Sequence, residues 1–225
     1  MQLRSGVGSK AAVLVALAAL ITACGSGADG AGTEKPPTAA DTGAGTAASG
    51  KPAAGTTDFA TVFNTERRIQ SALPDPSQMA EWTPKTGRAD IEEQPKSPVE
   101  CGPDAHWDCT AIADGSAKFE AFGETVIFGI KAYADQKAAH DACGKEAAWS
   151  AKYTKANVSP VAGVTSHAYY RNAGSLDGLD LIMCTGTVIA EIRLEGPGSD
   201  LNPATAHRMA EGTFVPRIQT AAAAS

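Results

Sequence analysis

The sequence predicts an α+β fold: an antiparallel sheet with helices packed on one face, and two disulfide bonds. Apolar and polar residues alternate in several short segments, among them 126–133 and 188–194, and this period of two is typical of half-buried strands. Segments with helical spacing lie between them. The chain has five cysteines, four of which follow residue 100, and an even number favours disulfide pairing. Strands with one polar face favour an antiparallel sheet that helices cover on the other face.

The first predicted element is an amphipathic helix over residues 59–73. Its apolar residues recur at near-helical spacing, and Pro74 and Pro76 end it. Residues 74–108 are rich in proline, glycine and charge. Since that is long for a structureless loop in a compact domain, we expect a short strand there or ordering by a disulfide.

The middle of the chain predicts two strands and a helix. Residues 110–121 form the first strand and residues 126–133 the second. Asp135 is suited to cap a helix over residues 138–152, which are mostly good helix formers.

Three strands and a last helix are predicted in the C-terminal part. The strands are 166–172, 179–184 and 188–194. Asn202 followed by Pro203 has the pattern of a helix start, and Pro216 is expected to end or kink that helix.

Cys101, Cys109, Cys143 and Cys184 allow three pairings. We favour Cys101 with Cys109, closing a small loop, and Cys143 with Cys184, joining the middle helix to the sheet. If Thr185-Gly186 is a two-residue turn, Cys184 faces away from the side of the strand that carries Leu181. In that case either the opposite face is buried near the turn, or the turn lies elsewhere.

The N-terminus predicts export and lipid attachment. Residues 11–23 are apolar and uncharged after Arg4 and Lys10, and the run is too short to span a bilayer. Ile21-Thr22-Ala23-Cys24 resembles the bacterial lipobox, in which the cysteine is lipidated and becomes the mature N-terminus. Two acyl chains or more give stable anchoring. We therefore expect a signal peptide over 1–23, a lipidated Cys24 with a flexible tether over 24–57, and one extracytoplasmic domain over 58–225.

Charge and motifs exclude several functions. The formal net charge is −6, with 19 Lys and Arg against 25 Asp and Glu, so nucleic acid is not an expected partner. There is no G-x-S-x-G motif and no C-x-x-C pair, and the four histidines are scattered. Asp104, His106 and Asp108 alternate in a loop, but a solvated acidic loop is favoured over a cation site. We expect no catalytic residue, no metal and no cofactor.

Aromatic residues are the remaining candidates for ligand binding. Trp82, Trp149, Tyr169 and Tyr170 are large enough to line a groove, although most aromatic residues in a domain of this size lie in the core.

The chain resembles small actinobacterial lipoproteins, and residues 58–225 resemble the extracellular sensor domain of PknH-like kinases. The second resemblance rests on residues 126–149, a strand leading into an alanine-rich helix with Cys143 and Trp149, on the later strand with Cys184, and on the count of four cysteines. It implies an α+β fold with a cleft for a ligand, and no site residue is carried over from it.

These observations favour a cell-surface, non-enzymatic ligand-binding or sensor-like domain. Its expected partners are the membrane, through the lipid anchor, and a small molecule or envelope protein. A concave pocket lined by Tyr169, Tyr170 or the tryptophans would support it. An interaction or structural lipoprotein without ligand predicts a flat polar sheet face instead. An envelope hydrolase, the third possibility, requires titratable side chains that converge in a cleft.

Overall fold

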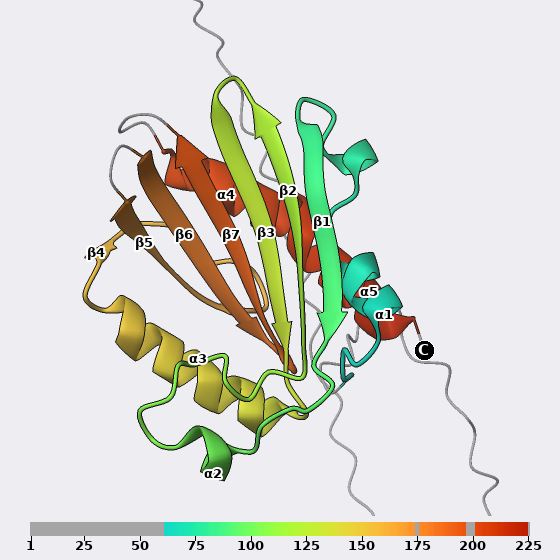
Figure 1. The fold of residues 1–225 in the computed structure, drawn as a ribbon. Helices are drawn as coiled ribbons and strands as arrows, with labels where there is room; N and C mark the ends of the chain where they lie inside the picture. The colour runs from blue at the N-terminus through green and yellow to red at the C-terminus, as the bar shows by residue number, and fades with distance from the viewer. Residues whose placement is uncertain (1–60, 174–175, 197–200, 225) are drawn as a thin grey trace, which may run out of the picture. The chain divides into compact units, whose positions relative to one another are not determined.

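The computed structural model describes residues 61–173, 176–196 and 201–224. The predicted signal peptide, Cys24 and the tether lie outside these residues. Figure 1 shows the described part as one fan-shaped sheet with helices against it. The α+β class, the antiparallel sheet and the two disulfides are confirmed.

Seven strands form the sheet, in the order β1-β2-β3-β7-β6-β5-β4, and every neighbouring pair is antiparallel. Their bounds are β1 Thr83–Ile91, β2 Ala113–Ala121, β3 Glu124–Ala132, β4 Thr154–Lys155, β5 Thr165–Ala173, β6 Leu176–Thr185 and β7 Val188–Gly196. The sheet therefore consists of two runs of sequence-adjacent strands, β1–β3 and β4–β7, joined where β3 pairs with β7.

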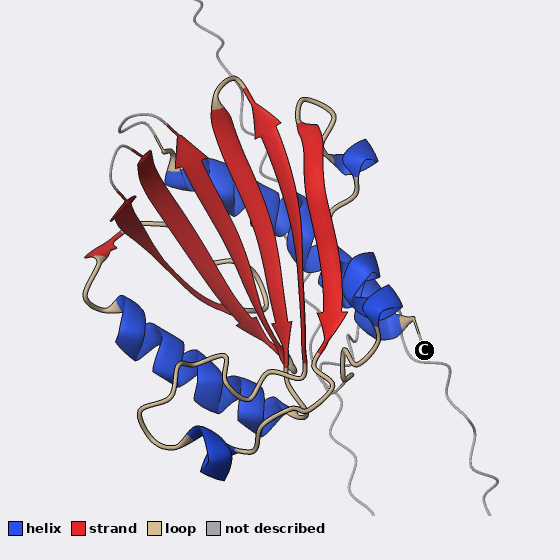
Figure 2. Ribbon diagram, in the orientation of Figure 1, coloured by secondary structure: helices blue, strands red, loops and turns tan. Residues whose placement is uncertain are grey.

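The helices are short except for α3 (Figure 2). Their bounds are α1 Glu66–Ala72, a 3-10 turn Pro76–Gln78, α2 Pro98–Cys101, α3 Gln136–Ser150, α4 Pro203–Met209, a π turn Ala210–Phe214 and α5 Val215–Ala223. Asp135 caps α3 and Asn202 caps α4, as the sequence predicts.

One face of the sheet carries a continuous apolar core under α1, α4 and α5. Phe128 is fully buried there, and its ring packs edge-on against Phe119 of β2 and Phe214 of the π turn. Gly115 of β2 lets α1 approach closely, because a methyl group at that position would overlap the Ile69 side chain. These contacts fix α1 and the C-terminal helices on the same side of the sheet.

The helix α3 packs on the opposite face, which corrects the expectation that all helices lie on one side. The residues Ala139 and Ala142 of α3 contact Ile182 and Ile189, which alternate with the residues of the larger core. The turn between β6 and β7 is Gly186-Thr187, one residue later than predicted. Since both faces of the sheet are buried near this turn, Ile182 and Met183 are both inaccessible although they point in opposite directions.

Two predicted helix boundaries also differ from the structure, whereas the expectation for residues 74–108 is met. The first helix begins at Glu66 rather than residue 59. Residues 74–108 contain both of the features expected of them, the strand β1 and the Cys101–Cys109 disulfide. Pro216 does not end the last helix: it occupies the first turn of α5, where its missing N–H is tolerated, directly after the π turn.

Candidate functional site

A groove runs between α3 and the end of the sheet formed by β5, β6 and the start of β7. Its volume is about 840 Å³. We call it the α3 groove; it is lined by Gln136, Lys137, Ala139, His140, Cys143, Gly144, Ala147, Thr165, His167, Cys184, Thr185, Gly186 and Val188. The Cys143–Cys184 disulfide ties its two walls together.

Small side chains on α3 leave room for the groove. Ala139 is buried against the sheet, whereas Gly144 and Ala147, five and eight residues further along the helix, are exposed. A side chain added at Gly144 would meet open space, so nothing in the described residues fills the volume beside it. A helix with larger residues at these positions would close the groove.

A buried polar cluster lies at the α3 groove. Glu146 is 1% exposed, and its Oε2 atom lies 2.6 Å from Nε2 of His167 on β5. The hydroxyl of Ser150 lies 3.3 Å from the same nitrogen, and the Tyr169 hydroxyl donates to Glu146 Oε1 at 3.4 Å. Burial raises the pKa of Tyr169, and the carboxylates of Asp180 and Glu146 add to that shift. The cluster therefore holds the His167 ring in a fixed position at the wall of the groove.

The geometry of this cluster differs from that of a catalytic triad. In a triad, one imidazole nitrogen contacts the nucleophile and the other contacts the carboxylate. Here Ser150 and Glu146 both contact Nε2 of His167. The Ser150 side chain is also buried, which keeps its hydroxyl away from a substrate in the groove. The arrangement positions a histidine and gives no route for activating the serine.

A row of aromatic rings extends from the sheet across the C-terminal end of α3. Tyr169 stacks on Tyr153 with centroids 5.2 Å apart, and Tyr153 packs edge-on against Trp149 at 5.4 Å. His106 continues the row, 5.8 Å from Trp149. The ammonium of Lys152 lies 4.4 Å from the centre of the Trp149 ring, a cation–π contact.

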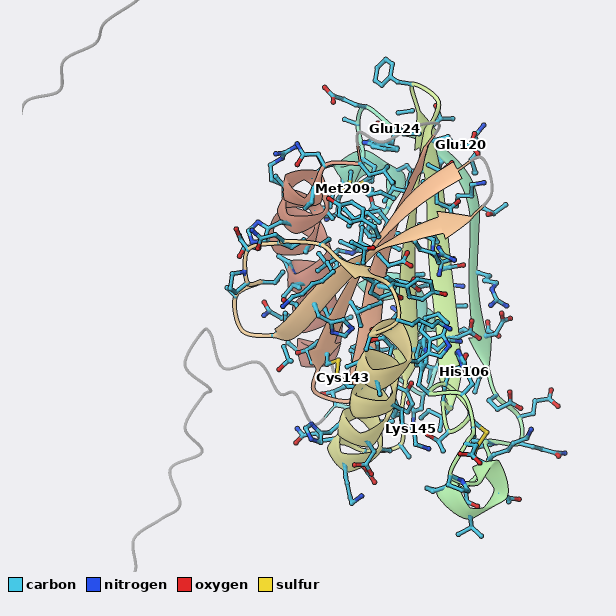
Figure 3. The ribbon with its side chains drawn as sticks, turned by 90° about the vertical axis from the view of Figure 1, so that its left-hand side faces the viewer. His106, Glu120, Glu124, Cys143, Lys145 and Met209 are labelled. Atoms are coloured by element: carbon cyan, nitrogen blue, oxygen red, sulfur yellow. A yellow bond between two sulfur atoms is a disulfide. The ribbon has the colours of Figure 1, made fainter. Side chains whose placement is uncertain are left out.

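A second groove, of about 550 Å³, lies on the other side of α3, beneath the loop closed by Cys101 and Cys109. Figure 3 shows Cys143 on one side of the helix, and His106 and Lys145 on the other. We call it the loop groove. His140 and Gly144 line both grooves, so only the width of α3 separates them.

Ion pairs order the loop beside the second groove. Asp108 contacts His106 at 2.5 Å and Lys131 of β3 at 3.5 Å. Burial opposes ionisation of Asp108, but the hydrogen bond from His106 and the charge of Lys131 outweigh it and lower its pKa. The described residues hold no cluster of three or more His, Cys, Asp or Glu side chains placed to bind a metal.

Beyond α3, the same face of the sheet is polar. Asp180 of β6 is 1% exposed and lies 3.1 Å from both Arg171 and Arg193. Glu191 pairs with Arg193 at 2.7 Å, yet burial raises its pKa against the effect of that arginine, with Asp180 adding to the rise. Both arginines of this network therefore pair with carboxylates that belong to it.

The structure brings together two of the four aromatic residues predicted to bind a ligand. Trp149 and Tyr169 belong to the aromatic row. Trp82 and Tyr170 pack against the core on the opposite face. None of the four predicted residues is among those that line the α3 groove or the loop groove.

Sequence reasoning missed Glu146 and Ser150, and it treated His167 as one of several scattered histidines. A signal for the first two exists: Ala139, Ala142, Glu146 and Ser150 recur at helical spacing and are the buried residues of α3. Nothing in the sequence indicates that His167 lies opposite them.

The comparisons with known proteins identify no relative by sequence. No family model matches the chain, and no curated protein matches it significantly. The fold is similar to the extracellular domain of PknH from Mycobacterium tuberculosis, with a TM-score of 0.43 and 10% sequence identity, over 72% of this chain and 97% of that one. The resemblance is weak, so membership of the PknH-like sensor family stays a prediction.

Proposed function

We propose that residues 58–225 form a non-enzymatic ligand-binding domain with a sensor-like role, and that the α3 groove is its binding site. The observation that carries this proposal is a groove of about 840 Å³ with an apolar wall and one histidine held by a buried polar cluster. Ligand sites commonly have volumes of roughly 300–1,000 Å³, mostly apolar walls and a few fixed polar groups.

The polar cluster supports binding rather than hydrolysis. A hydrolase would need a base that can reach both its nucleophile and a substrate. His167 instead meets Ser150 and Glu146 through one nitrogen, and both of these side chains are buried. Their arrangement suits a site that recognises a molecule without transforming it.

We further propose that the domain works outside the cytoplasm, attached to the membrane by lipid on Cys24. The lipobox supports the anchor. Two disulfides fit an oxidising compartment. In the part of the chain that the structure describes, none of the helices could span a bilayer. In this arrangement the ligand would be a small molecule of the envelope or its surroundings, or part of an envelope protein.

Two neighbouring alanines allow a test of the site. Ala147 lines only the α3 groove and Ala148 lines only the loop groove, and both are exposed on the same helix. Leucine is nearly as good a helix former as alanine, so Ala147→Leu and Ala148→Leu should fold equally well. Only the first should obstruct the proposed site.

The measurement is native against denatured mass of the exported chain, purified under mild conditions. We expect an additional native mass for the wild-type chain and for Ala148→Leu, lost on denaturation, and none for Ala147→Leu. A bare native mass for the wild-type chain would count against the proposal. Retention of the extra mass by Ala147→Leu and its loss from Ala148→Leu would move the site to the loop groove.

A further inference from the structure

We propose that the ligand of the α3 groove is an amphiphile with an acidic headgroup, a carboxylate or a phosphate. This inference rests on the proposed function and adds the chemical class of the ligand. The residues that line the groove differ in charge from the chain as a whole. The chain carries a net charge of −6, yet no Asp or Glu is found among the described residues that line the groove. Lys137, His140 and His167 do line it.

The wall of the groove suits an alkyl chain. Ala139, Ala147 and Val188 line it together with the Cys143–Cys184 disulfide, whose sulfur atoms are bonded to each other and offer no thiol. Removing apolar surface of this kind from water is favourable, so a bound alkyl chain would be stabilised there. A small, fully hydrated anion would leave that surface exposed, so the wall selects for a ligand with an apolar part.

His167 supplies a directed hydrogen-bond donor for the headgroup. Glu146 and Ser150 occupy Nε2, and Nδ1 has no hydrogen-bond partner among the described residues. The imidazolium form carries an N–H at both nitrogens, so Nε2 can keep its ionic contact with Glu146 while the Nδ1 N–H donates to a ligand oxygen. Charge-assisted hydrogen bonds are about twice as strong as neutral ones. A carboxylate or phosphate oxygen is therefore a better partner than the hydroxyl of a neutral lipid.

Lys137 adds a positive charge to the lining of the groove, and His140 lies about one helical turn from it. Both are exposed on the first turns of α3, and Lys137 pairs with Asp141 at 2.6 Å. Exposed ion pairs of this type contribute little to helix stability, because water screens both charges. The lysine can therefore exchange Asp141 for an acidic headgroup at little cost.

The test compares three probes with the same chain length: decanoic acid, decan-1-ol and monodecyl phosphate. The protein is the mature chain carrying Cys24→Ser, so that no acyl group of its own competes for the groove. Affinities are measured by titration calorimetry, below the aqueous solubility limit of the alcohol and below the critical micelle concentrations of the acid and the phosphate. We expect the acid and the phosphate to bind at least about tenfold more tightly than the alcohol, the ratio that one charge-assisted hydrogen bond gives.

Variants separate the headgroup site from the rest of the groove. Lys137→Gln should reduce the preference for the acid over the alcohol at least about threefold and leave the affinity for the alcohol unchanged. Lys145→Gln, the matched control, lines only the loop groove and should change neither value. Ala147→Leu should weaken the binding of all three probes. A preference that falls as salt is added would agree with this assignment.

The two proposals fail in different ways. Equal affinities for the acid and the alcohol, both lost in Ala147→Leu, would overturn the acidic headgroup and leave the binding domain intact. A carried peptide or neutral lipid in the native mass would do the same. If no probe binds and the exported chain carries no extra mass, both proposals are wrong. A difference between the acid and the phosphate would show which headgroup the site prefers.

Discussion

The two faces of the sheet are held together by different means. Under α1, α4 and α5 the contacts are almost entirely apolar and continuous from Phe119 through Phe128 to Phe214. On the α3 face a small apolar cluster is combined with a disulfide, a buried Glu146–His167 contact and the Asp180 network. Chemically versatile groups therefore gather on the face with the smaller core. The first face can supply stability to the fold, which leaves the second free to hold polar groups and open grooves.

The largest difference between the faces should appear when the disulfide of the α3 face is removed. Replacing Cys143 and Cys184 together by serine opens a crosslink over 41 residues, and chain entropy predicts a loss of about 4 kcal/mol in the free energy of unfolding. Cys101 and Cys109 are separated by only 8 residues, so their double replacement should cost about 2.5 kcal/mol.

Urea unfolding of both double variants, expressed in an oxidising compartment, measures these losses. The loss in unfolding free energy can be smaller for the Cys143–Cys184 double variant than for the Cys101–Cys109 double variant. In that case α3 does not depend on its crosslink to the sheet. The apolar contacts of Ala139 and Ala142 would then be sufficient to hold the helix.

Two glycines test the faces with the same chemical change. Gly115 faces α1, and a methyl group there would overlap Ile69, so Gly115→Ala should destabilise the domain by roughly 1–3 kcal/mol. Gly129 faces the opposite way, and an added Cβ would lie 3.5 Å from the Glu191 carboxylate, an ordinary contact. Because alanine restricts the unfolded chain more than glycine, Gly129→Ala should be neutral or stabilising by up to about 1 kcal/mol.

Thermal unfolding of the two variants shows whether each substitution lowers or raises the stability of the domain. Opposite signs would confirm that packing is tight on the face under α1 and tolerant on the face that carries α3. A loss at Gly129 equal to that at Gly115 would contradict this difference.

The smallest expected effect is the pH dependence contributed by Asp108, beside the loop groove. Its pKa in the folded state is lowered, so the carboxylate stabilises the fold above the unfolded-state pKa of about 3.9. That contribution is lost as the pH falls through the folded-state pKa. Asp108→Asn should therefore be less stable than the wild-type chain at pH 6, by roughly 1 kcal/mol or less, and equal to it near pH 2.

Chemical unfolding between pH 2 and pH 7 measures this convergence. Asp104→Asn is the control, since it removes a carboxylate from the same loop and no ion pair of Asp104 is found among the described residues. A constant gap for Asp108→Asn would show that His106 and Lys131 do not set the stability of the loop.

Much of the fold follows from local patterns in the sequence. The alternation in β2, β3 and β7, the caps Asp135 and Asn202, and the favoured disulfide pairing all agree with the structure. These features depend on residues close together in sequence or, for the disulfides, on there being few partners to choose from.

What the sequence did not predict depends on tertiary contacts. β1 is an edge strand, exposed along most of its length with Ala89 as its one buried residue, so it shows no alternation. The buried face of α3 consists of small and polar residues, which gives no hydrophobic direction from which to choose a side of the sheet. Glu146 and His167 meet only because β5 returns beneath α3, and no local pattern encodes that contact.

The pairing of β3 with β7 has a consequence for how the chain folds. Each other strand pair joins neighbours in the sequence, whereas here Ala132 meets Val188 and Thr125 meets Glu195. Closing so long a segment costs more entropy than forming a hairpin, so this pair should be the slow, late step of folding. The Cys143–Cys184 bond lies wholly within that segment and shortens the loop that must close. Oxidation should therefore accelerate assembly of the sheet as well as stabilise it, and the reduced chain should pass more slowly through a state with two unjoined halves.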